Sequence, residues 1–148
     1  MEKSIQVGNI EIRRSNVLDK EEKEQISLLV SVCNRADGTC NELFLTNEFN
    51  VYPEMPCFFR AYVEDGNTEP GLDGVLIIYG DQEKMAEISA YVLPEQRGKG
   101  VFHALFHTAL EYIRFFGYSE LEFKTEKAYP AAGDILKKYG AVLIRKEY

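Results

Sequence analysis

Apolar and polar residues alternate in several short stretches of the chain, with the period of two that is typical of β-strands. Strands are predicted over residues 4–14, 58–64, 74–79, 85–93, 121–125 and 141–148. Gly8-Asn9 interrupts the first of them. Residues 74–79 are apolar at successive positions, as in a strand that is buried on both faces. Residues 80–84 should join this strand to the next as a hairpin.

Apolar residues at helical spacing predict three helices, over residues 20–36, 101–116 and 131–139. Asp19 is a good N-cap for the first, Gly117 is the predicted C-cap of the second, and Gly140 stops the third. Between residues 39 and 57, Asn and Pro residues break up a group of aromatic residues, and either a second short helix or a substrate-side loop is expected there.

The resulting order, β-α-(α)-β-β-β-α-β-α-β, predicts a mixed α+β or α/β layer fold. A length of 148 residues fits a single domain spanning 1–148, and 45% apolar with 28% charged residues is ordinary globular composition. The longest apolar run, Val75–Tyr79, is too short to cross a membrane. The first residues contain no apolar stretch of the secretory type, so a cytoplasmic protein is expected.

The net charge of −7 is unevenly distributed. Residues 36–96 hold twelve Asp or Glu against Arg60 and Lys84, so this segment carries −10 and the rest of the chain +3. Such an acidic protein is a poor partner for nucleic acid or an anionic membrane. The acidic segment is either solvated surface or a rim that attracts a cationic partner.

Neither cysteine nor histidine spacing indicates a metal site. Cys33, Cys40 and Cys57 contain no CxxC pair, so reduced thiols are expected. His103 and His107 are four residues apart on a predicted helix, but position 104 is Ala rather than Glu. A solvated helix face is the simpler interpretation, and no metal is predicted.

The chemically informative feature is a turn rich in glycine and charge, residues 94–100, between a predicted strand and a predicted helix. Glycine lets the backbone come close to a ligand. The first amide N–H groups of a helix lack partners within it, so together they form an anion site for phosphate or pyrophosphate. Arg97 and Lys99 add positive charge at the mouth of this site.

Two other phosphate motifs do not fit these residues. A Walker loop requires GxxxxGK followed by Ser or Thr, which is absent. A dinucleotide GxGxxG would need a third glycine at His103. It would also follow the first strand, whereas this turn follows the fourth predicted strand.

Residues 90–100, AYVLPEQRGKG, resemble motif A of the GNAT superfamily of acetyl-CoA-dependent N-acetyltransferases, a strand, then Arg/Gln-x-x-Gly-x-Gly/Ala, then a helix. Arg97 matches the first position and Gly100 the central glycine. Phe102 stands where the family usually has Gly or Ala, so its side chain must find room. The resemblance spans nearly the whole chain, with Tyr139-Gly140-Ala141 matching a downstream motif.

This resemblance implies a central, mostly antiparallel sheet that opens at the motif strand, flanked by helices. It implies that the pantetheine arm of acetyl-CoA pairs with the strand backbone, that the pyrophosphate sits on the loop, and that a strand amide holds the acetyl carbonyl as an oxyanion donor. The implied cofactor-binding residues are Tyr91, Val92, Leu93, Arg97, Gly98, Lys99, Gly100, Val101 and Phe102.

The implied reaction is direct attack of a neutral amine on a thioester. Because an alkyl amine has a pKa near ~10, the site must remove a proton. Glu87, on the motif strand and opposite Ile88 and Val92, is the candidate base, and a surface or structural Glu is the alternative. Many family members protonate the thiolate with a Tyr where this chain has Leu136, and Tyr139 is a substitute candidate.

We therefore expect an enzyme that acetylates a small or peptidyl amine, with the acidic segment favouring a cationic one. The alternatives are a non-catalytic acyl-CoA-binding or regulatory module, favoured by Phe102 and Leu136, and half of a larger assembly. The last strand is expected to be short, so a partner protomer in a homodimer is one source of a further strand.

Overall fold

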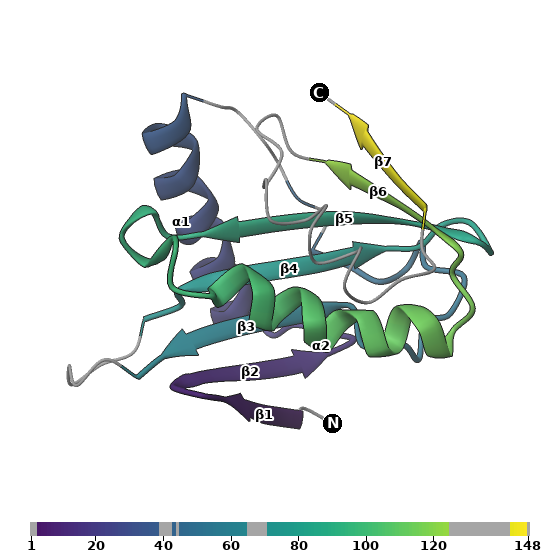
Figure 1. The fold of residues 1–148 in the computed structure, drawn as a ribbon, viewed down its shortest axis with the longest axis horizontal. Coiled ribbons are helices and arrows are strands. Elements are labelled where there is room, and N and C mark those ends of the chain that lie inside the picture. Colours follow the sequence, from purple (N-terminus) through teal and green to yellow (C-terminus); the bar gives the residue numbers. More distant parts are fainter. Residues whose placement is uncertain (1–2, 39–42, 44, 65–70, 125–142, 148) are drawn as a thin grey trace.

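The computed structural model describes residues 3–38, 43, 45–64, 71–124 and 143–147. Their strands form one sheet in the order β1-β2-β3-β4-β5-β6-β7 (Figure 1). The strands are β1 (Lys3–Val7), β2 (Ile10–Ser15), β3 (Phe58–Val63), β4 (Gly74–Tyr79), β5 (Met85–Val92), β6 (Glu120–Lys124) and β7 (Leu143–Glu147). Neighbours from β1 to β5 are antiparallel, and β5–β6 and β6–β7 are parallel. The predicted mixed, mostly antiparallel sheet is confirmed.

Two helices cover opposite faces of this sheet (Figure 1). Helix α1 (Lys20–Asp37) lies behind it and α2 (Val101–Phe115) crosses in front. Neither of these described helices is long and apolar enough to cross a membrane. The predicted first strand is two strands, because Gly8, with φ +60°, turns β1 back onto β2. At the end of α2, Phe116 is the C-cap and Gly117 follows it in the left-handed conformation.

Helix α1 is fixed to the sheet at its first turn. Asp19 caps the helix by accepting from the N–H of Glu22, and the Glu22 side chain accepts from the N–H of Asp19, both at 2.8 Å. The other carboxylate oxygen of Glu22 lies 2.6 Å from the guanidinium of Arg60, which is 1% exposed on β3. Glu22 thus joins the helix start to a charge buried beneath it, which would be costly to leave unpaired.

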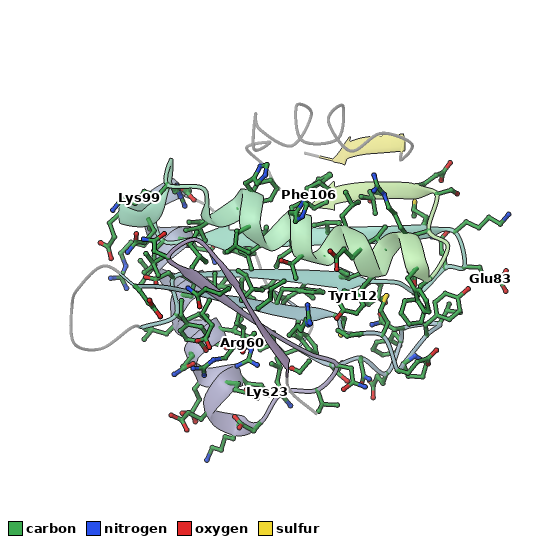
Figure 2. All side chains as sticks on the ribbon, turned by 60° about the horizontal axis from the view of Figure 1, so that its bottom comes forward. Lys23, Arg60, Glu83, Lys99, Phe106 and Tyr112 are labelled. Carbon is green, nitrogen blue, oxygen red and sulfur yellow. The ribbon has the colours of Figure 1, made fainter. Side chains whose placement is uncertain are left out.

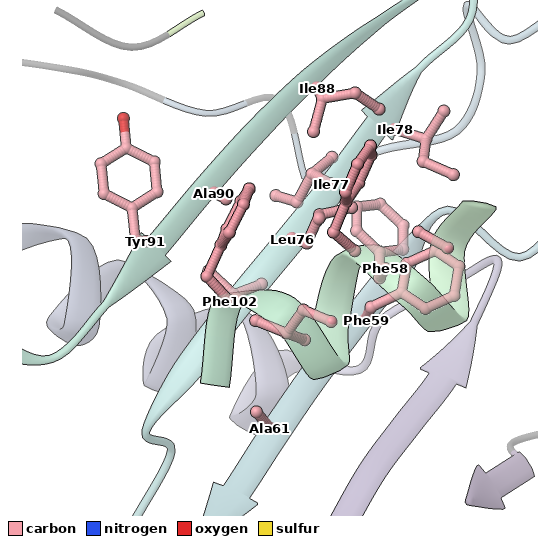
Figure 3. Close-up of a cluster of buried hydrophobic side chains, with 14 of the residues drawn as sticks. Phe58, Phe59, Ala61, Leu76, Ile77, Ile78, Ile88, Ala90, Tyr91 and Phe102 are labelled. Atoms are coloured by element: carbon pink, nitrogen blue, oxygen red, sulfur yellow. The ribbon is translucent and has the colours of Figure 1, made fainter. Parts of the chain in front are cut away.

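Helix α2 packs closely on the other face because β4 begins with Gly74. A Cβ there would lie 2.8 Å from Cγ1 of Val101 and 3.2 Å from Cδ1 of Leu105. Further along the same face, the rings of Phe102 and Phe106 stack at 5.8 Å, and Phe106 meets Phe123 of β6 edge-on at 5.5 Å. Figure 3 shows Phe102 beside Ala90, with Tyr91 pointing away on the other side of β5.

The segment between α1 and β3 is a loop in its described part, residues 43 and 45–57. Asn50 is buried, its side-chain oxygen accepts from the N–H of Gly80 at 2.8 Å, and the N–H of Val51 donates to the Gly80 carbonyl at 2.7 Å. These bonds attach the loop to the end of β4. Of the two alternatives for this segment, the described residues favour the loop. The predicted helix 131–139 lies outside the described residues.

Replacing Gly74 with Ala should destabilise the protein by about 1–3 kcal/mol, because the new methyl group overpacks the contact between β4 and α2. Gly71→Ala is the matched control, since a Cβ at Gly71 meets nothing within 4 Å. Urea unfolding of the two variants measures the difference. Equal midpoints and equal free energies of unfolding would contradict this packing constraint.

Candidate active site

Strand β5 pairs with its two neighbours over different lengths. On one side, β4 pairs with it from Glu87 to Val92, and on the other β6 pairs only from Met85 to Ile88. Beyond that point β6 turns away from β5, as the diverging ribbons in Figure 1 show. The sheet therefore opens along the second half of β5, as expected for the motif strand.

Backbone groups at the end of β5 point alternately to the two edges. The N–H of Leu93 donates to the Asp73 carbonyl on the β4 side at 2.9 Å. Because an antiparallel ladder alternates, the N–H and carbonyl of Val92 point to the β6 side, and those of Tyr91 and Leu93 to β4. The Val92 carbonyl accordingly accepts from Nε of Arg97 at 3.0 Å and from Sγ of Cys33 at 3.4 Å. Among Tyr91, Val92 and Leu93, Val92 presents its amide to the open edge.

The loop after β5 leads directly into the N-terminus of α2. A single 3-10 turn, η1 (Pro94–Gln96), follows the strand, and Gly98 and Gly100 then adopt φ +80° and +86°. Nothing lies within 4 Å of a Cβ built on either glycine. Gly100 is the N-cap of α2 and offers no side chain, so the first N–H groups of the helix face an open, glycine-lined surface. This geometry suits an anion such as pyrophosphate.

Two acidic side chains hold the start of this loop. Nε2 of Gln96 donates to Oδ1 of buried Asp73 at 3.3 Å, and Oδ2 of Asp73 accepts from the N–H of Val63 at 2.7 Å. The guanidinium of Arg97 donates to both carboxylate oxygens of Asp37, at 2.7 and 2.8 Å. The positive charge predicted at the loop mouth is therefore paired at Arg97. Lys99 is exposed beside the start of α2 (Figure 2).

Neither of the two described thiols is poised as a nucleophile. Cys33 is buried on α1, and its burial, only partly offset by Arg97, raises its pKa. Burial also raises the pKa of the Cys57 thiol to about 12. Because the thiolate is the reactive form, neither described cysteine suits covalent acyl transfer at neutral pH.

Glu87 lies on the α1 face of the sheet, half-buried, between acidic and phenolic neighbours. In register it faces Tyr79 on β4 and Glu122 on β6. Burial and then the negative charges of Asp81 and Glu87 raise the pKa of Tyr79. Two carboxylates and a phenol thus lie close together at this point of β5.

Phe102 does not project into the loop surface. Its side chain is 8% exposed and stacked on Phe106 in the α2 face of the core. The Phe102 side chain is thus accommodated in the core and does not cover the main-chain amides of the loop. Val101 is buried beside it, against Gly74. Leu136 and Tyr139 lie outside the described residues.

A separate cavity of 550 Å³ lies at the far end of α2. It is lined by Arg14, Ser15, Asn16, Glu54, Pro56, Glu111, Tyr112, Phe115 and Phe116. Ten or more residues of helix, about 15 Å, separate its lining residues on α2 from Gly100. It is therefore distinct from the loop surface.

Sequence comparison identifies the family to which this arrangement of strand, loop and helix belongs. The profile of the acetyltransferase (GNAT) family matches residues 24–141. This chain belongs to the GNAT family. It is an enzyme of the N-acetyltransferase type, as the resemblance of residues 90–100 predicted. No protein of curated function matches the chain by sequence.

Solved GNAT structures share the fold at low sequence identity. An acetyltransferase from Streptococcus agalactiae 2603 has a TM-score of 0.65 and 14% identity, over 90% of this chain and 84% of that one. An aminoglycoside acetyltransferase from an uncultured soil metagenomic sample, in complex with sisomicin, has a TM-score of 0.54 and 15% identity, over 95% of each. A GCN5-related N-acetyltransferase from Sphaerobacter thermophilus has a TM-score of 0.59 and 15% identity, over 92% of this chain, which spans 44% of that protein.

Sequence reasoning missed the carboxylates that hold this GNAT loop. Asp73 directly precedes the predicted strand 74–79, and nothing in the sequence marks it as the partner of Gln96, 23 positions away. Asp37 carried a weak signal, because an acid in the last turn of a helix opposes the helix dipole. That unfavourable position indicates a compensating partner, which is Arg97.

Proposed function

We propose that this GNAT enzyme transfers an acetyl group from acetyl-CoA to a primary amine of a cationic acceptor, by direct attack in a ternary complex. The observation that carries the proposal is strand β5, which joins an open glycine loop at one end to Glu87 on its α1 face. A donor held on the loop and an acceptor near Glu87 would meet along one strand. Residues 1–148 would act as one domain.

Acetyl-CoA fits the chain's own residues. Gly98 and Gly100 leave the loop surface clear, and the first N–H groups of α2 face it, so the segment Arg97–Phe102 would hold the pyrophosphate through its backbone. Lys99 is exposed beside this surface and would add charge. When bound, the cosubstrate supplies a thioester, an acyl group already activated for transfer to nitrogen.

At the open edge of β5, Val92 would play two roles. Its carbonyl, in the peptide group shared with Leu93, accepts from Arg97 and Cys33, and the peptide group that carries its N–H is oriented by the pairing of Tyr91 with Val75 of β4. Its N–H points to the same edge and would donate to the acetyl carbonyl as an oxyanion donor. The amide is oriented before any ligand arrives, and this preorganisation is what makes such a donor effective.

Glu87 would take the proton that the acceptor must lose, directly or through water. It is half-buried, next to the edge that β6 leaves, and its neighbours Tyr79 and Glu122 come from the two adjacent strands. The carboxylates of Glu87 and Glu122, side by side in register, would also attract an ammonium group. This favours a cationic acceptor over a neutral or anionic one.

The acceptor class is tested by thiol release from acetyl-CoA with three matched amines: a linear diamine, an alkyl amine of equal length and the corresponding amino acid with a terminal carboxylate. We expect kcat/KM to fall in that order, because the distal group changes from positive to neutral to negative near Glu87. The preference should weaken at high salt. Turnover only on the neutral or the anionic amine would refute a cationic acceptor.

Glu87→Gln should lower kcat by about 10²-fold or more, with acetyl-CoA affinity nearly unchanged, because it removes a general base and leaves the loop intact. The acidic limb of the pH–rate profile should disappear. Glu83→Gln is the control, since Glu83 is exposed in the hairpin before β5, far from Lys99 (Figure 2). A profile that keeps its acidic limb in Glu87→Gln would remove Glu87 from this role.

Gly100→Val should abolish the micromolar binding of acetyl-CoA, about −8 kcal/mol, that we expect from calorimetric titration of the unmodified protein. The new side chain would stand on the loop surface where phosphates approach. Gly117→Val is the control: both glycines are left-handed, at φ +86° and +82°, and both have open space at Cβ, so the backbone strain is matched. Equal affinities in the two variants would mean that the loop is not the phosphate site.

A further inference from the structure

Asp37 occupies a position that its own helix disfavours. It is the last residue of α1, where the exposed carbonyl groups give the helix end a partial negative charge, and Gly38 caps the helix in the left-handed conformation. A cation suits this position better, as Arg35 in the same turn does. An acid retained here points to a function outside the helix.

The partner of Asp37 is the first residue of the glycine loop, 60 positions away. Arg97 makes two parallel N–H···O bonds to the carboxylate, at 2.7 and 2.8 Å, a geometry that fixes orientation as well as distance. Its remaining Nε–H donates to the Val92 carbonyl at 3.0 Å. One guanidinium therefore joins the end of α1, the end of β5 and the start of the loop.

We propose that Asp37 is a positioning residue for acetyl-CoA binding: it holds the Arg97 side chain on α1 and thereby fixes the loop whose backbone receives the pyrophosphate. This inference rests on the proposed function of the loop. In this arrangement the positive charge of Arg97 is paired with Asp37 and does not serve as a phosphate ligand. The phosphates are then left to main-chain N–H groups and to Lys99.

The loop needs such an anchor because of its glycines. Gly98 and Gly100 have more backbone freedom than any other residue and give the loop no side-chain contacts. Immediately before them, Gln96 is bonded to Asp73 and Arg97 to Asp37. Two carboxylates from different parts of the chain therefore hold two neighbouring residues in place. Together these contacts set the direction in which the glycines leave the sheet.

Because the ligand is negatively charged, the direction in which acetyl-CoA affinity changes when Asp37 is replaced distinguishes the two possible roles of Arg97. Acetyl-CoA is a polyanion, so removing a nearby carboxylate should by electrostatics alone tighten its binding. If Arg97 contacted the phosphates directly, Asp37→Asn would release it for that contact and tighten binding further. If Asp37 positions the loop, the same substitution weakens binding despite the more favourable charge.

The experiment is calorimetric titration of acetyl-CoA into the unmodified protein and into Asp37→Asn, Arg97→Gln and the double variant. We expect each single variant to bind about 3- to 10-fold more weakly, the range for a partly exposed bidentate ion pair. The double variant should be no weaker than Arg97→Gln alone, because the contact with Asp37 is already lost when Arg97 is replaced. Asp37→Glu, which keeps the carboxylate, should recover part of the affinity.

Kinetics separate positioning from a general loss of structure. In Asp37→Asn the KM for acetyl-CoA should rise, whereas kcat, the KM for the amine and the urea unfolding midpoint should stay close to those of the unmodified protein. The kcat/KM for acetyl-pantetheine, which lacks the pyrophosphate, should not change. Glu24→Gln removes the same charge from an exposed site on the same helix and should not weaken binding of acetyl-CoA.

Binding by Asp37→Asn that equals or exceeds that of the unmodified protein would overturn the positioning role and make Arg97 a direct phosphate ligand. Additive losses in the double variant would overturn it as well. Failure of the unmodified protein to bind acetyl-CoA would refute the proposed function itself, and with it this inference. The two failures are therefore distinguishable in one titration series.

Discussion

The site depends on how the chain leaves the sheet at Val92. A strand normally ends wherever its ladder ends, but here the last carbonyl of β5 is held by Arg97 and Cys33, although no strand pairs with it on that side in the described residues. That contact fixes the peptide group between Val92 and Leu93, from which the chain enters η1 and the two glycines before α2. A change in this direction would displace the glycine loop, and with it the proposed pyrophosphate site.

The two faces of the sheet differ in the side chains that they carry. The α2 face is an apolar packing surface, where Gly74 admits the helix and Phe106 joins Phe102 of α2 to Phe123 of β6 through ring contacts. The α1 face carries the polar residues, with Arg60 neutralised by Glu22 and with Glu87 between strands. Because β5 is shared by both faces, its α2 side can be core while its α1 side carries Glu87, the proposed base.

The spacing of apolar residues was enough to predict most helices and strands. The glycine loop could be predicted because its motif is one uninterrupted stretch of sequence. Periodicity placed β3, β4, β5 and both described helices to within a residue or two, since each buries one stripe or face. The loop's anchors could not be predicted. Asp37 reaches Arg97 across 60 residues and Asp73 reaches Gln96 across 23, and no spacing rule relates residues that meet only through the fold. Phe102, which looked like an obstacle in the motif, is core, because helical position and not sequence distance decides which way a side chain points.

The acidic segment 36–96 therefore has a mixed explanation. Two of its carboxylates, Asp37 and Asp73, are bound to the loop and are unavailable to a cationic acceptor. Others, Asp81 and Glu87, lie near Tyr79, whose pKa is raised first by burial and then by these two charges. In the proposed function, the charge that would bear on acceptor choice is thus local, at the end of β5 opposite the loop. An anionic donor and a cationic acceptor would each approach the part of the strand with the complementary charge, and the same strand would keep them in order.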